Sequence, residues 1–321
     1  MTAARALLTA LALAALSASA HAQSRPAQKQ QTPTAKGQDS VDLAFGAYQR
    51  GFYLTAFYEA TKRVDEHADP NAMTLLGELY ANGFGVKQDD AKAAEWYRLA
   101  AERGNREAMF ALAMFRLGGR GGEKNRDEAA KLLTAAAKLG HAAAAYDLAL
   151  LHIEGVQFPQ DFARAAELLR QAADAGSPEA QYALATFYKE GRAVAKDEAQ
   201  AARLMQQAAR GGNVAAQTEY AIALFNGAGV PKDEAASARL MLDSARRGSV
   251  VAQNRLARIY AAGRGLPADA MEACKWHIIA KAGGATDLYL DDFMRQQPPN
   301  VREAAEKAAK PWLERIAESR S

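Results

Sequence analysis

The sequence repeats itself every 36 residues. One column of glycines carries this period, and a column of alanines runs in phase with it. The glycines are Gly104, Gly140, Gly176, Gly212, Gly248 and Gly284, and the alanines are Ala72, Ala108, Ala144, Ala180, Ala216 and Ala252. A fixed period of this length is typical of a solenoid, in which each repeat packs only against its neighbours. The sequence therefore predicts six copies of one structural unit.

Each unit predicts two helices joined by a loop. In the first unit, Ala72, Leu76 and Tyr80 lie on one apolar stripe with the 3.6-residue period of an α-helix. Gly83 can end this helix in the left-handed conformation, and Asp89 can cap the next one. Only 8% of the residues are aromatic, which disfavours a β-sandwich or barrel. We therefore expect an all-α fold built from 36-residue helix-loop-helix repeats.

The spaced residues resemble the Sel-1-like repeat family, which is related to tetratricopeptide repeats. The resemblance covers residues 70–284 and rests, in the first unit, on Ala72, Leu76, Gly77, Leu79, Tyr80, Gly83, Gly85, Val86, Asp89, Ala93, Trp96, Tyr97, Ala100, Ala101 and Gly104. It implies a right-handed α/α superhelical solenoid that serves as an adaptor, assembly factor or regulator, in many members within bacterial envelopes. Some bacterial members are rich in cysteine and linked to β-lactam binding or hydrolysis, whereas this chain has the single Cys274.

The first 22 residues are typical of a cleaved signal peptide. Arg5 precedes an apolar run from Ala6 to Leu16, and Ala20-His21-Ala22 matches the pattern that signal peptidase cuts. The run is too short to span a membrane, which takes about 20 residues. We therefore expect a periplasmic or secreted protein that is not inserted in the membrane after cleavage.

The remaining segments flank the repeats. Residues 23–40 are polar and predict a disordered linker, because they offer little apolar surface to bury. Residues 41–69 predict a degenerate N-terminal capping repeat, and residues 285–321 predict C-terminal capping helices. Such ends are needed because a terminal repeat has an apolar face without a further neighbour.

Composition and side-chain spacing argue against several functions. The formal net charge of +3 is too small for the basic surface of a nucleic-acid binder. The histidines after residue 22, which are His67, His141, His152 and His277, have no metal-ligand spacing and are interpreted as helix and cap residues. Cys274 falls in a column of small residues, so we expect a buried thiol. The sequence thus indicates no catalytic residue, metal or cofactor, although a cell-wall or β-lactam-active hydrolase remains the alternative.

Binding is better supported, because one face of each first helix varies between repeats. The positions equivalent to residues 74, 78 and 81 lie opposite the constant stripe and would be polar on a free surface helix. In the central repeats they are apolar or aromatic instead, and the candidate partner-binding residues are Phe110, Met114, Tyr146, Leu150 and Tyr182. These residues either line an open groove for a protein or peptide, of unknown identity, or pack inside a tightly wound solenoid. The first reading makes the chain a non-enzymatic interaction scaffold of the cell envelope.

Overall fold

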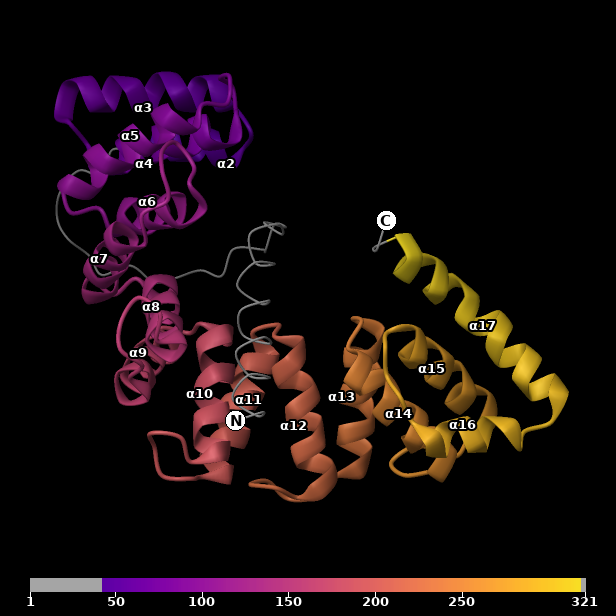
Figure 1. Cartoon of the computed structure of the whole chain (residues 1–321). Coiled ribbons are helices and arrows are strands. Elements are labelled where there is room, and N and C mark those ends of the chain that lie inside the picture. The colour runs from indigo at the N-terminus through magenta and orange to yellow at the C-terminus, as the bar shows by residue number, and fades with distance from the viewer. Residues whose placement is uncertain (1–41, 319–321) are drawn as a thin grey trace. The chain divides into compact units, whose positions relative to one another are not determined.

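The structure is a computed structural model that describes residues 42–318, which form sixteen helices and no strand (Figure 1). The signal peptide and linker expected in residues 1–40 lie outside the described residues. Each repeat contributes two helices, as predicted. The first helices are α4 (Pro70–Asn82), α6 (Arg106–Gly118), α8 (Ala142–Glu154), α10 (Pro178–Glu190), α12 (Val214–Asn226) and α14 (Val250–Ala262). The second helices are α5 (Asp90–Glu102), α7 (Arg126–Lys138), α9 (Phe162–Asp174), α11 (Glu198–Arg210), α13 (Glu234–Arg246) and α15 (Ala270–Ala282).

The ends of these helices follow the 36-residue period. The side chains of Asp89, Asn125, Asp197, Asp233 and Asp269 each accept a hydrogen bond from the backbone N–H three residues on, which caps a second helix. Gly83 ends α4 with φ +68°, and its five equivalents also have a left-handed backbone. The caps and turns predicted from the sequence are thus confirmed. Together with the helix pairs, they establish an all-α repeat solenoid.

The described residues divide into two compact units, with the boundary inside α9, between Ala165 and Ala166. In the N-terminal unit, α2 (Leu43–Gln49) and α3 (Tyr53–His67) precede α4, and each helix up to α8 packs on the next. In the C-terminal unit, α10 to α15 pack in the same way, and α16 (Leu288–Arg295) and α17 (Pro299–Glu318) pack on α15. No helix within residues 42–318 is long and apolar enough to cross a membrane.

Small residues set the helix spacing in the N-terminal unit. The ring of Tyr97 is buried against Gly77, where a Cβ atom would lie only 2.6 Å from the ring. The Tyr97 hydroxyl donates a hydrogen bond to Glu78 Oε2 at 3.0 Å, so its polar atom is also satisfied. Burial and the neighbouring Glu78 raise the pKa of Tyr97, which keeps the ring neutral.

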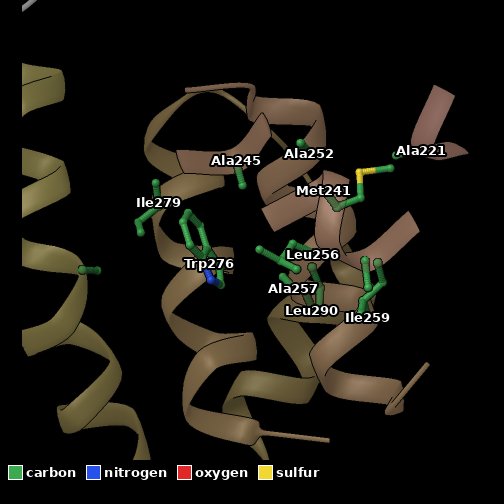
Figure 2. Close-up of a cluster of buried hydrophobic side chains, with 12 residues drawn as sticks. Ala221, Met241, Ala245, Ala252, Leu256, Ala257, Ile259, Trp276, Ile279 and Leu290 are labelled. Atoms are coloured by element: carbon green, nitrogen blue, oxygen red, sulfur yellow. The ribbon is translucent and has the colours of Figure 1, made fainter. Parts of the chain in front are cut away.

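The core of the C-terminal unit combines alanines with a few large side chains. Trp276 is buried beside Leu256, Ile279 and Leu290, and Figure 2 shows these side chains converging from several helices. The Trp276 ring meets the Trp312 ring of α17 edge to face, with 5.3 Å between centroids. Cys274 is also buried in this unit, as its place in a column of small residues predicts. Burial raises the pKa of its thiol.

Loops dock on the preceding repeat where a glycine permits close approach. Gly229 lies in the loop between α12 and α13 with φ +70°, and a Cβ atom there would lie 2.1 Å from the carbonyl oxygen of Glu198. Gly265, one period later, has the same relation to the carbonyl oxygen of Glu234. No side chain fits in these two contacts, so Gly229 and Gly265 fix how the fifth and sixth repeats sit on the repeats before them.

We predict that Gly229→Ala destabilises the protein much more than Gly248→Ala. Both glycines have positive φ, so alanine costs about 1–2 kcal/mol of backbone strain at either position. Only Gly229 also has a backbone neighbour in clashing distance, whereas a Cβ atom at residue 248 meets nothing within 4 Å. The free energy of unfolding from urea titration should fall by a further ~2 kcal/mol or more for Gly229→Ala. Equal losses for the two variants would contradict the docking role.

Candidate functional site

The C-terminal unit has a hollow between the first helices α12 and α14, above the second helix α13. Its volume is about 330 Å³. We call it the Arg255 pocket, and it is lined by Ile222, Phe225, Asn226, Ser237, Met241, Arg255, Arg258, Ile259, Ala262, Arg264 and Tyr289. Aliphatic and aromatic side chains thus share the lining with three guanidinium groups. This combination suits a ligand that carries both an apolar part and a negative charge.

A second hollow lies between α10 and α12, above α11. Its volume is about 170 Å³, and we call it the Glu219 pocket. It is lined by Lys189, Glu198, Ala201, Ala202, Met205, Glu219, Ile222, Ala223, Asn226 and Ala228. Because Ile222 and Asn226 line both hollows, the two pockets adjoin each other across α12.

The 36-residue period explains why both hollows exist. Met205 and Met241 occupy equivalent positions of successive repeats, and so do Ala223 and Ile259. The two pockets are therefore the same surface feature, formed at equivalent positions of two successive repeats. Each hollow is lined by two successive first helices and by the second helix that lies between them in the sequence.

The two pockets differ in one pair of residues. In the Glu219 pocket, Lys189 Nζ and Glu219 Oε2 form an ion pair at 2.6 Å between α10 and α12. One repeat later, the equivalent positions hold Phe225 and Arg255. Phe225 offers no carboxylate, so Arg255 makes no ion pair or hydrogen bond with any described side chain. Its exposed guanidinium is thus available to a ligand.

The other two guanidinium groups of the Arg255 pocket are already paired. Arg258 donates to both carboxylate oxygens of the buried Asp287, at 2.6 and 2.8 Å, and lies over the Tyr289 ring. Burial alone would raise the pKa of Asp287, but hydrogen bonds from Arg258, Asn254 and the Leu290 backbone lower the pKa to about 2. Arg264 pairs with Glu234 and lies 4.3 Å from the centroid of the Phe225 ring. These contacts hold two walls of the pocket in place.

The five binding residues predicted from the sequence lie in other repeats of the same helix face. Tyr146 is buried, with only 8% of its surface exposed, which is the internal packing that the alternative expected. Phe110, Met114, Leu150 and Tyr182 are half-buried, and the Phe110 ring stacks on His141 at 4.5 Å. Tyr182 belongs to the C-terminal unit and the other four to the N-terminal unit. Their role in partner binding stays a prediction.

Sequence reasoning missed the residues that line the Arg255 pocket. Two of them had a signal, because Ile222 is equivalent to Met114 and Leu150, and Phe225 is equivalent to Leu117. Extending the same comparison by one repeat, beyond that of Tyr182, would have found both. The sequence contains no such signal for Arg255. Its column lies nearer the constant stripe and has no common chemistry, since it holds Leu75, Ala111, Asp147, Ala183 and Glu219.

The described residues contain no cluster of three or more His, Cys, Asp or Glu side chains that could hold a metal ion. His141 caps α8 by accepting a hydrogen bond from the Ala144 backbone, and His277 lies 2.9 Å from Asp291. Both histidines thus have structural partners, consistent with their interpretation as helix and cap residues.

Asp147, which shares a column with Glu219 and Arg255, gives a test of the electrostatics of this helix face. Burial raises the pKa of Asp147 from 3.8 to about 7. A carboxyl group whose pKa is raised by folding stabilises the protein below pH 4, and this contribution is lost as the pH rises to about 7. We therefore predict that Asp147→Asn raises the urea midpoint relative to the wild type at pH 8 and has a much smaller effect at pH 4. A pH-independent difference between the two proteins would contradict this.

The comparisons with known proteins agree with the helical repeat. The Sel1 repeat family model matches residues 70–105, 106–141, 142–177, 178–213, 214–249 and 250–284, and each match starts at the first residue of a first helix. No curated protein matches the chain.

Solved structures of the same kind are similar along most of the chain. A Sel1 repeat protein from Oxalobacter formigenes is 29% identical with a TM-score of 0.65, over 75% of this chain and 98% of its own. The c5321 protein, a protective antigen of uropathogenic Escherichia coli with an SLR fold, is 25% identical with a TM-score of 0.59. That similarity covers 86% of this chain and 68% of the antigen. With six matched repeats over residues 70–284, the chain belongs to the Sel1 repeat family.

Proposed function

We propose that the chain is a non-enzymatic interaction scaffold of the bacterial cell envelope, where it acts as an adaptor or regulator. It binds a protein or peptide along the concave face formed by its first helices. Sel1 repeat proteins are generally protein-interaction scaffolds. The observation that carries the proposal for this chain is the recurrence of one hollow in successive repeats, at α10–α12 and at α12–α14.

The dimensions and lining of the hollows favour an extended polypeptide as the partner. Each pocket has apolar side chains on its floor, such as Met205 or Met241, and polar groups at its rim. A protein interface commonly combines an apolar centre with a polar, hydrated rim. Adjoining pockets of this kind can take successive side chains of one bound segment.

The envelope setting rests on residues 1–22, whose pattern is typical of a cleaved signal peptide. A periplasmic or secreted protein meets its partners outside the cytosol. The partner is therefore sought among envelope proteins.

We predict that Asn226→Trp abolishes partner binding without unfolding the protein. Asn226 is exposed and lines both pockets, so an indole there would obstruct both at once. The purified protein, immobilised, would be exposed to a periplasmic extract, and the retained proteins would be quantified by mass spectrometry. A specific partner should be retained at least fivefold less by the variant than by the wild type.

Gln207→Trp is the matched control, because Gln207 is an exposed residue of the second helix α11. It should retain the partner as the wild type does. Equal retention by Asn226→Trp and Gln207→Trp would contradict binding along the first-helix face. Turnover of cell-wall fragments or β-lactams by the purified protein would instead favour the hydrolase alternative.

A further inference from the structure

One guanidinium group of the Arg255 pocket has no carboxylate partner among the described residues. Its lining has three guanidinium groups, of which Arg258 pairs with Asp287 and Arg264 pairs with Glu234, a carboxylate that Lys232 also contacts. Arg255 has no such partner among the described residues, because the position that pairs with its column in the preceding repeat holds the uncharged Phe225 here. Arg255 is therefore the guanidinium of the lining that is left for a negatively charged group of a ligand.

Most of the remaining lining is apolar or aromatic, and Asn226 and Ser237 are its polar members. Ile222, Phe225, Met241 and Ile259 come from three helices, and Met241 and Ile259 are almost fully buried. A volume of about 330 Å³ is at the lower end of the roughly 300–1,000 Å³ range of small-molecule sites. The pocket thus has room for one apolar group of a ligand beside the negatively charged group that pairs with Arg255.

We propose that the Arg255 pocket binds the C-terminal residue of a peptide, with its carboxylate on Arg255 and its apolar side chain on the pocket floor. A C-terminal residue carries both groups on one Cα atom, as the lining requires. A guanidinium can donate two parallel hydrogen bonds to a carboxylate, which gives orientation as well as charge. This inference rests on the proposed function and names the part of the partner that is recognised.

The neighbouring pocket favours a peptide over a free organic acid. Asn226 stands where the two hollows adjoin, and its side-chain amide can both donate to and accept from a peptide group. Beyond it, the Glu219 pocket has small apolar residues, and each of its charged side chains is ion-paired, Lys189 with Glu219 and Glu198 with Lys196. The residues that precede the C-terminus can follow this path with uncharged side chains.

The test compares two pools of N-acetylated pentapeptides. Each pool has three randomised positions followed by Ala-Leu, and the pools differ only in a free C-terminal carboxylate or a C-terminal amide. The immobilised full chain should retain the acid pool at least tenfold better than the amide pool, because a charge-assisted hydrogen bond is worth roughly tenfold or more in affinity. Equal retention of the two pools, or retention of neither at about millimolar peptide, would overturn the inference.

Two arginine variants distinguish an effect of the Arg255 charge from an effect of positive charge anywhere on the surface. Arg255→Gln should lose the preference for the acid pool, and Arg239→Gln, an exposed arginine of α13, should keep it. Both variants should unfold at the wild-type urea midpoint, since neither side chain has a protein partner to lose. Preference for the acid pool in Arg255→Gln would overturn the assignment of the carboxylate to Arg255.

Two further results separate this inference from the proposed function. If octanoate binds in an Arg255-dependent manner and no peptide does, the pocket is a site for small amphiphilic acids, and the peptide assignment is wrong. If the acid and amide pools bind equally and Asn226→Trp abolishes both, the groove binds peptides without reading the C-terminus. That outcome overturns this inference and leaves the scaffold function standing.

Discussion

Helices in each repeat approach one another where their side chains are smallest, and the rest of the structure depends on this contact. Five first helices have a fully buried alanine at one position, namely Ala113, Ala149, Ala185, Ala221 and Ala257, and α4 has Gly77 there. In the second helices, an equally small column faces them. Its one polar member, Ser237, donates a hydrogen bond to the Ala221 carbonyl at 2.6 Å, so this hydroxyl is satisfied although it is buried.

This contact also decides where the chain is free to vary. The small columns, the caps and the loop glycines are committed to holding one repeat on the next, so they recur with the period. The outward positions of the first helices do not hold one repeat on the next, so their side chains can differ between repeats. Between α10 and α14 the same hollow can therefore hold a neutral ion pair in one repeat and an unpaired Arg255 in the next. Binding chemistry is added to the scaffold without changing how it packs.

Much of the fold could be predicted from the sequence because its determinants are local and periodic. Asp89 caps α5 through a backbone N–H only three residues away, and Gly83 ends α4 by its own left-handed backbone. The candidate site could be predicted only in part. The burial of Tyr146 depends on neighbours that no single column reveals. Arg255 is available to a ligand because Phe225, 30 positions before it, has no carboxylate. The sequence around Arg255 therefore does not distinguish it from an ordinary solvent-exposed arginine.

The central claim is that one repeat is a complete unit of the structure, and removal of residues 214–249 tests it most directly. The deletion joins Asn213 to α14, and Asn213 already caps the equivalent helix α12 by accepting a hydrogen bond at 2.9 Å. Gly265 would then dock on Glu198 in place of Gly229, glycine for glycine. Circular dichroism should show unchanged helicity per residue and one cooperative thermal transition, whereas removal of residues 214–231, half a period, should abolish cooperative folding in the C-terminal unit. If the two deletions melt alike, the repeat is not the structural unit.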